Sequence, residues 1–230
     1  MKLDKRLSVI GNFVPVGARL ADIGTDHAYL PAALLQTGQI AYAVAADIAA
    51  DPCKVALNTL QMYGVSGGSE VRQGSGLSVL QVGECDCIVV AGMGGATIVD
   101  ILKADLQVAR SAKRLILQPM VGAAAVRKFL LEQGFALVAE DLVEDGKFLY
   151  EIMVAEYQGQ VQTLPEAVLL IGPVLLKQRH PLLTWQFVRQ KGILQRTLKE
   201  MQKSSVAVAG VKYQELQNLL YEMEKLEKNL

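Results

Sequence analysis

Short apolar runs alternate with helix-length segments from residue 19 to about residue 157, and this alternation restricts the fold more than any other feature of the chain. The predicted strands of this series are residues 19–23, 43–48, 86–91 and 114–118. Strands joined by helices form repeated βαβ units, whose strands run parallel in one sheet. The pattern therefore predicts an α/β fold with a parallel sheet.

The last two predicted strands, residues 135–144 and 148–157, are separated only by a turn around Asp145-Gly146, which indicates a hairpin. A parallel sheet that ends in an antiparallel hairpin is typical of the seven-stranded methyltransferase fold. The ordinary dinucleotide-binding fold lacks that reversed strand. We therefore predict a Rossmann-like, seven-stranded class I methyltransferase domain over residues 1–159.

The pattern changes over residues 160–230. A proline-containing connector (residues 160–182) precedes two predicted helices, residues 183–203 and 213–228, around a turn at 204–210. Apolar residues recur in both helices at intervals of three and four, which predicts a helical coiled-coil extension. Between Lys177 and Lys212 the chain has eight Lys or Arg and a single Glu. Such a concentration of positive charge favours an anionic partner, most commonly nucleic acid. A helical face that is merely exposed to solvent would show the same pattern of charged residues.

Composition excludes several classes of protein. The chain has no apolar run of eighteen residues and no apolar segment behind its charged N-terminus, so we expect no membrane span and a cytoplasmic protein. The cysteines are Cys53, Cys85 and Cys87, and only His27 and His180 could add imidazoles. Without a CxxC pair this set does not indicate a metal site, and we expect buried, reduced thiols.

The turn after the first strand carries the clearest chemical signal. The strand ends at Ile23, the turn passes through Gly24, and a helix begins near residue 29. Glycine would let a ligand approach backbone N–H groups, because no Cβ blocks it. The turn lacks GxGxxG and carries Asp22 and Asp26, which repel a pyrophosphate but suit the ammonium and sulfonium of S-adenosylmethionine. The alternative is an ordinary turn in which Asp26 caps the helix.

Two further segments follow later strands at the same edge of the sheet. Asp47 lies 23 residues beyond Gly24, a spacing at which a carboxylate can reach ribose hydroxyls, unless it is simply an exposed strand-end residue. Glycines at 74 and 76 would let the chain wrap an adenine edge. Many methyltransferases have an acidic residue where this chain has Ser75, so an adenine would depend on backbone contacts.

The fourth and fifth strands end in segments suited to an acceptor. Ala91-Gly92-Met93-Gly94-Gly95 leaves room for a flat substrate beside the methyl donor. Gln118 could hydrogen-bond a base edge, or could only satisfy its own loop.

Together, DIGTDHAYLP at 22–31, AGMGG at 91–95 and LILQP at 115–119, with the helical extension, resemble the bacterial tRNA (adenine-N1) methyltransferases called TrmK. That family methylates adenine 22 in the D-arm of tRNA. The resemblance spans essentially the whole chain. It implies S-adenosyl-L-methionine as the methyl donor, tRNA as the partner, and a Rossmann-like domain joined to a coiled coil that contacts tRNA.

The resemblance also implies site residues. Those expected around the donor are Asp22, Gly24, Thr25, Asp26, His27, Tyr29, Asp47, Ile48, Gly74, Ser75, Gly76, Ala91, Gly92, Met93, Gly94 and Gly95. Those expected to contact tRNA are Gln118, Pro119, Met120, Arg189, Lys191, Arg196, Lys199 and Lys203. Adenine N1 already carries a lone pair, so transfer needs positioning more than a base. Asp26 would stabilise the cationic product or bind the donor's amino group, with His27 orienting it or relaying a proton.

Other interpretations stay open. A methyltransferase for another acceptor would keep the first domain and use the helices to dimerise. A non-catalytic adaptor would bind RNA or protein through the coiled coil. A nicotinamide-dependent oxidoreductase is the least favoured, because the third glycine is missing and the turn is acidic. We expect a monomer or weak dimer.

Overall fold

The computed structural model describes residues 2–230, which divide into two compact units with the boundary between Gln162 and Thr163. The division falls close to the boundary expected after residue 159. None of the helices in the described part of the chain is long and apolar enough to cross a membrane.

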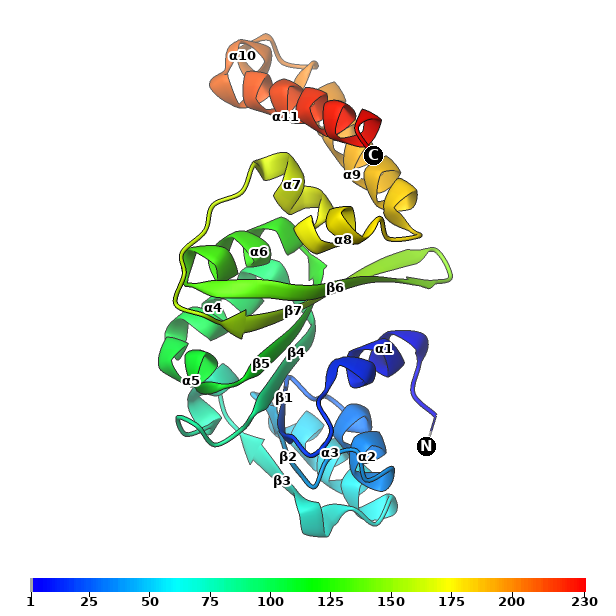
Figure 1. Cartoon of the computed structure of the whole chain (residues 1–230), viewed down its shortest axis with the longest axis vertical. Coiled ribbons are helices and arrows are strands. Elements are labelled where there is room, and N and C mark those ends of the chain that lie inside the picture. The colour runs from blue at the N-terminus through cyan, green and yellow to red at the C-terminus, as the bar shows by residue number, and fades with distance from the viewer. Residues whose placement is uncertain (1) are drawn as a thin grey trace. The chain divides into compact units, whose positions relative to one another are not determined.

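The first unit is built on one seven-stranded sheet with the order β3-β2-β1-β4-β5-β7-β6 (Figure 1). The strands are β1 (Arg19–Ile23), β2 (Tyr42–Asp47), β3 (Ser69–Gln73), β4 (Cys87–Gly94), β5 (Arg114–Val121), β6 (Phe135–Asp145) and β7 (Phe148–Tyr157). The first five run parallel, and β7 pairs antiparallel with both β5 and β6. The predicted class I methyltransferase topology is confirmed.

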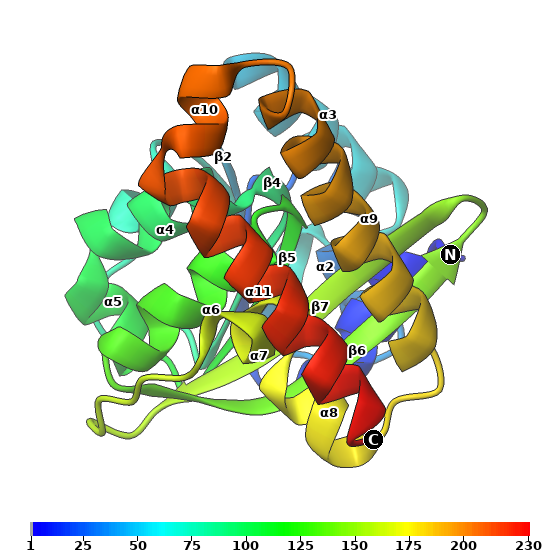
Figure 2. The same ribbon diagram turned by 90° about the horizontal axis from the view of Figure 1, so that it is seen from above.

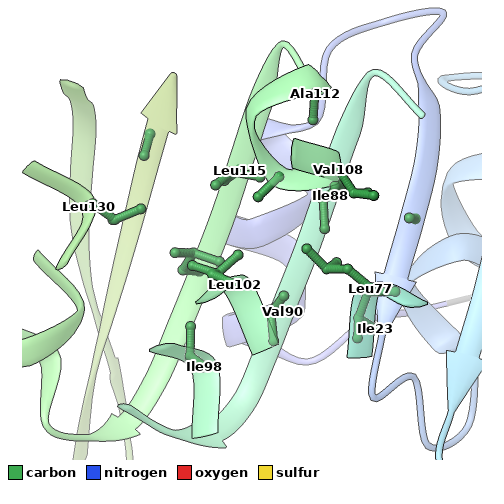
Figure 3. Close-up of a cluster of buried hydrophobic side chains, with 14 of the residues drawn as sticks. Ile23, Leu77, Ile88, Val90, Ile98, Leu102, Val108, Ala112, Leu115 and Leu130 are labelled. Carbon is green, nitrogen blue, oxygen red and sulfur yellow. The ribbon is translucent and has the colours of Figure 1, made fainter. Parts of the chain in front are cut away.

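Helices cover both faces of this sheet. One face carries α1 (Lys5–Phe13), α2 (Tyr29–Gln36) and α3 (Ala50–Met62), and the other carries α4 (Gly95–Ala104), α5 (Leu106–Ser111) and α6 (Ala123–Glu132). Two 3-10 turns, η1 (Ser66–Gly68) and η2 (Gly76–Val79), flank β3. In β4, Ile88 and Val90 pack toward α4 and α5 (Figure 3), while Val89 between them packs toward α1 and α2. Both faces are apolar because a parallel sheet is buried on both sides.

Helix α3 begins without a side-chain cap. Ala49 holds the cap position and Asp51 lies inside the first turn, 3.0 Å from Lys54 Nζ. Pro52 is tolerated in that turn because the first N–H groups of a helix have no partner within it. Glycines end two of these helices, since Gly64 and Gly134 follow α3 and α6 with φ of +69° and +84°.

The second unit is entirely helical. It contains α7 (Glu166–Ile171), α8 (Pro173–Gln178), α9 (Leu183–Met201), α10 (Ser205–Ala209) and α11 (Val211–Lys228). Three of these were missed, because α7 and α8 lie in the predicted connector and α10 in the predicted turn. The prolines start helices here: Pro165 is the N-cap of α7 and Pro173 is the first residue of α8.

Helices α9 and α11 pack side by side, as the coiled-coil prediction required (Figure 2). Each of these helices has two adjacent apolar residues near the seam, and one of the two is buried there. Leu194 and Leu219 are buried, whereas Ile193 is exposed and Leu220 is only partly buried. Polar pairs also join the two segments: Lys191 pairs with Glu227, and Gln202 Nε2 donates to Tyr213 Oη at 2.9 Å.

A fully buried arginine links α6 to the terminal hairpin. Arg127 Nε lies 2.6 Å from Glu140 Oε1 on β6, and its Nη2 lies 2.8 Å from Glu151 Oε2 on β7. Burial works to lower the pKa of Arg127, but the two carboxylates outweigh it and raise that pKa. The guanidinium therefore stays charged and neutralises carboxylates that could not otherwise be buried.

Replacing Arg127 should therefore be severe. Arg127→Met leaves two buried carboxylates without their cation, and we expect it to lower the free energy of unfolding by about 3–5 kcal/mol in urea titrations. The matched control is Lys128→Met. Lys128 is exposed, and its sole charged contact, with Glu132 in the described chain, is long at 3.9 Å. That variant should change stability by less than about 0.5 kcal/mol. Equal losses in the two variants would contradict the role assigned to Arg127.

Candidate active site

A pocket opens at the carboxyl edge of the sheet, where the strand order reverses. β1 lies between β2 and β4, with Ile23 in register with both Ala46 and Val90. The segments that follow β1, β2, β3 and β4 therefore meet at one edge, as ligand sites in open α/β sheets do. The pocket encloses about 490 Å³, part of it open to solvent. Its lining is Ile23, Gly24, Ala46, Asp47, Ile48, Gly74, Ser75, Gly76, Met93, Thr97 and Ile101.

Three of the lining residues must be small. A Cβ on Gly24 would lie 2.0 Å from Met93 Cε, and one on Gly74 would lie 2.5 Å from Val79 Cγ1. A Cβ on Gly76 would lie 3.0 Å from Ile101 Cγ2, and both Gly24 and Gly76 have positive φ. The pocket is thus a cradle of backbone walled by apolar side chains and open to a flat, partly polar ligand.

Backbone hydrogen bonds hold the turn after β1 against the neighbouring strand. The N–H groups of Gly24 and Thr25 both donate to the Ala46 carbonyl, at 2.8 and 3.0 Å. They tie the turn to β2, so these two N–H groups are not offered to a ligand. The alternative in which Asp26 caps the next helix is wrong, because Ala28 is the N-cap of α2 and no side chain caps it.

Asp22 lies beneath this turn and does not line the pocket. Its carboxylate is buried and accepts a hydrogen bond from Thr25 Oγ1 at 2.7 Å. Burial raises the pKa of Asp22 to about 6, while the Thr25 hydroxyl and the Arg6 cation act in the opposite direction. The group is therefore mostly ionised at neutral pH and places negative charge under the pocket, which suits a cationic ligand.

Asp26, His27 and Tyr29 form a connected surface group outside the pocket lining. Asp26 has φ of +50°, its side chain is 71% exposed, and its Oδ2 lies 2.8 Å from His27 Nδ1. The His27 ring stacks on the ring of Tyr29, with centroids 5.1 Å apart and planes 19° from parallel. The group combines a carboxylate, an imidazole and an exposed aromatic face in the segment that leads from the pocket into α2.

Gln118, which was expected either to hydrogen-bond a base edge or to satisfy its own loop, is fully buried. Its Oε1 accepts hydrogen bonds from Arg6 Nη1 at 2.7 Å and from the Gly92 N–H at 3.2 Å. A base edge could reach this amide only if Arg6 moved. Met120, two residues later, is exposed and is therefore the more accessible of the two side chains.

The basic residues predicted to grip nucleic acid do not share one environment. Arg196 and Lys199 are exposed on α9, and within residues 2–230 neither pairs with a carboxylate. Lys203 follows α9 and pairs with Glu200. Lys191 is only 21% exposed and pairs with Glu227 on α11, while Arg189 is half-buried. Arg196 and Lys199 therefore offer the uncompensated charge.

The pocket contains only part of the predicted set and some residues that the sequence did not reveal. Seven expected residues line it: Gly24, Asp47, Ile48, Gly74, Ser75, Gly76 and Met93. Four lining residues were missed: Ile23, Ala46, Thr97 and Ile101. Thr97 and Ile101 are four residues apart and begin just after the Gly94-Gly95 turn, so their shared helix face was the available signal.

The thiols and possible metal ligands play no part in this geometry. Cys53, Cys85 and Cys87 are free cysteines, and burial raises the pKa of Cys85 to about 11 and that of Cys87 to about 12. These two thiols stay protonated at neutral pH and are inert. Cys53 is only partly buried, against the expectation for all three. Among residues 2–230 no group of three or more His, Cys, Asp or Glu could hold a metal ion.

The strand order and the glycine-walled pocket define a Rossmann-like methyltransferase. Residues 3–153 match a family model described as a methyltransferase domain. The tRNA (adenine(22)-N(1))-methyltransferase of Bacillus subtilis (strain 168) is 38% identical over 187 residues, covering 78% of this chain and 77% of that protein. This chain belongs to the tRNA (adenine(22)-N(1))-methyltransferase family.

Solved structures agree with this assignment over almost the whole chain. The crystal structure of the B. subtilis m1A22 tRNA methyltransferase TrmK has a TM-score of 0.86 and 33% identity, covering 99% of this chain and 98% of that one. A Streptococcus pneumoniae protein, provisionally assigned as a tRNA (m1A22) methyltransferase, was crystallised in complex with S-adenosyl-L-methionine. It has a TM-score of 0.81 and 34% identity, covering 95% of this chain and all of that one.

The buried Asp22 makes stability depend on pH. With its pKa raised to about 6, the folded chain keeps a proton that the unfolded chain releases near the ordinary value of 3.8. The free energy of unfolding therefore falls as the pH rises between these two pKa values. The total loss is about 1.4 kcal/mol for each unit by which folding raises the pKa. Asp22→Asn keeps an acceptor for Thr25 and should raise the free energy of unfolding at pH 7.5 by about 1–3 kcal/mol. The gain should shrink by about half at pH 5.

Urea unfolding at several pH values measures this effect. Asp51→Asn is the matched control, because Asp51 is exposed on α3 and pairs only with Lys54 at the surface. It should change stability by less than about 0.5 kcal/mol at every pH. A loss of stability in Asp22→Asn that does not vary with pH would contradict the argument.

Proposed function

We propose that this chain transfers the methyl group of S-adenosyl-L-methionine to N1 of adenine 22 in tRNA. The observation that carries the proposal is the pocket at the carboxyl edge of β1, β2 and β4, in a chain 38% identical to a tRNA (adenine(22)-N(1))-methyltransferase. The donor supplies an electrophilic methyl group when it is bound. The protein must then hold the acceptor nitrogen in line and exclude competing geometries.

The residues of the pocket fit such a donor. Gly24 and the glycines at 74 and 76 leave room for an adenosine, Ile48 and Ile101 supply apolar walls, and Thr97 adds a hydroxyl. Asp47 Oδ1 accepts the Ala49 N–H at 2.9 Å, which orients the carboxylate for ribose hydroxyls. The charge of Asp22 beneath the turn favours a sulfonium and an ammonium. Ala91 and Gly94 would leave space on the acceptor side, whereas Gly95 is packed against the backbone of Val121 and Gly122.

We assign Asp26 the role of stabilising the positive charge of the methylated product, and not that of binding the donor's amino group. Its carboxylate is largely exposed and lies outside the pocket lining. Methylation of N1 leaves a cationic ring, and a carboxylate held by His27 would stabilise that charge as it develops. The stacked His27–Tyr29 pair would offer a flat surface to the base. His27 would orient Asp26 through the 2.8 Å contact.

The second unit would hold the tRNA backbone. Arg196 and Lys199 expose uncompensated charge on α9, and phosphates are the natural partners of such cations. Arg189 and Lys203 would contribute around them, whereas Lys191, already paired with Glu227, would mainly join α9 to α11. Pro119 and Met120 would contact the RNA beside the target base. A tRNA substrate implies a cytoplasmic protein, which we propose acts as a monomer or weak dimer.

Transfer of a labelled methyl group from S-adenosyl-L-methionine to unmodified bacterial tRNA, followed by nucleoside analysis, tests the activity. We expect labelled 1-methyladenosine. Asp26→Asn should reduce kcat by about 10- to 100-fold and leave the Kd for the donor within about twofold. A weakened donor Kd would instead assign Asp26 to the donor's amino group. Donor binding without any labelled tRNA would indicate another acceptor, and absence of donor binding would favour a non-catalytic adaptor.

Reversing the exposed charge on α9 tests the tRNA grip. The double variant Arg196→Glu with Lys199→Glu should raise the KM for tRNA by about tenfold or more at low salt, with the donor Kd unchanged. The effect should decrease as salt is raised, since phosphate contacts are screened. Lys54→Glu, an exposed lysine on α3 in the first unit, is the control. An unchanged KM for tRNA would exclude this face.

A further inference from the structure

An arginine on the first helix reaches across to the acceptor side of the candidate active site. We propose that Arg6 is a positioning residue for methyl transfer, and that it acts through Gln118 on the bulge of β4 at Gly92 (the Gly92 turn). The inference rests on the proposed function for the meaning of that turn. Nothing in the motifs around β1, β4 and β5 points to Arg6, which lies in the sequence far from all of them.

The amide of Gln118 is the centre of the arrangement. Arg6 Nη1 and the Gly92 N–H are both donors, so the side-chain atom between them is the amide oxygen, Oε1. The amide nitrogen lies on the other side, 3.6 Å from Met120 Sδ. Because the residue is fully buried, water cannot replace either donor. The orientation of the amide is therefore determined by Arg6 and Gly92 together.

Gly92 needs such a partner because the strand is irregular at this point. The β4–β5 register passes from Ala91 paired with Gln118 to Met93 paired with Pro119, so Gly92 is skipped. Gly92 has φ of +79°, a left-handed conformation that turns its N–H out of the regular ladder. The Gly92 N–H, displaced from the ladder, is taken up by the Gln118 side chain. The turn that leads to Met93 and the pocket is held by this bond.

Arg6 itself is held firmly enough to fix the amide. Its guanidinium lies over the ring of Tyr150 on β7, 5.7 Å from the centroid. The helix that carries it is anchored on the sheet by the buried Ile10, with Val14 just beyond its end. A Cβ on Gly92 would lie 3.5 Å from Arg6 Nη1, so the cation also abuts the turn directly. Arg6 thus joins α1, β7 and β5 to the Gly92 turn.

Removing the Arg6 cation should loosen the Gly92 turn. It should not change the shape of the donor pocket, whose lining does not include Arg6. We expect Arg6→Gln to lower kcat for tRNA methylation about tenfold, with the Kd for S-adenosyl-L-methionine within about twofold. Arg6→Lys should recover most of the loss, because a single N–H contact can be made by an ammonium. Lys5→Gln is the matched control, since Lys5 donates to the Glu144 carbonyl at the exposed end of the hairpin.

A double-mutant cycle tests the route through Gln118. Gln118→Leu and the double variant with Arg6→Gln should each lose about as much kcat as Arg6→Gln alone. Additive losses would overturn the proposal, as would an unchanged kcat in Arg6→Gln. A parallel fall in donor affinity and thermal stability that lysine does not rescue would reduce Arg6 to a structural role and also overturn it.

Amide hydrogen exchange at Gly92 gives a readout that needs no methyl acceptor. Exchange at this N–H should quicken about tenfold in Arg6→Gln and stay unchanged in Lys5→Gln. If the wild-type chain methylates no tRNA while Gly92 still responds to Arg6, the proposed function fails and the link from Arg6 to the turn stands. If tRNA is methylated normally and Gly92 exchange does not respond, the proposed function stands and the link is overturned.

Discussion

The site depends on one constraint of the sheet: β1 lies between β2 and β4, so the strand order reverses beside it. Helices leave β1 and β4 toward opposite faces, and the edge between them stays uncovered. Registers that pair Ile23 with both Ala46 and Val90 then bring the segment after β1 next to those after β2 and β4. The pocket, the charge beneath it and the acceptor turn all lie along this gap.

Buried charge recurs in this fold, and each instance has a different consequence. Arg127 with Glu140 and Glu151 joins α6 to the terminal hairpin and holds the reversed strand in place. Among residues 2–230 no cation pairs with Asp22, so its burial costs stability and leaves negative charge next to Ile23 of the pocket lining. Arg6 donates a hydrogen bond to the neutral amide of Gln118, and through this amide it orients the Gly92 turn. Buried charge is thus left without a contacting cation at the site and is neutralised by its partners at the edge of the sheet.

Much of the fold could be predicted because it follows from local pattern. The limits of β1 and β7 agree with the prediction residue for residue, since apolar runs bounded by glycine and charge define buried strands. The second unit was predicted less well. Its prolines suggested a connector, yet Pro165 and Pro173 begin helices, because a proline N–H is not needed in a first turn. Likewise, the choice of Leu194 over Ile193 depends on where the partner helix lies.

By itself the sequence determined the class of fold, the pocket glycines and the acidic turn, because these depend on residue type and on spacing along one strand and its loop. Only the tertiary structure decided which polar groups are already used. The N–H groups of Gly24 and Thr25 are taken by Ala46, Gln118 is buried under Arg6, and Lys191 is paired with Glu227. Each of these bonds joins segments that are distant in sequence or belong to different elements. Hydrogen bonds of this kind depend on packing geometry, which no local pattern records.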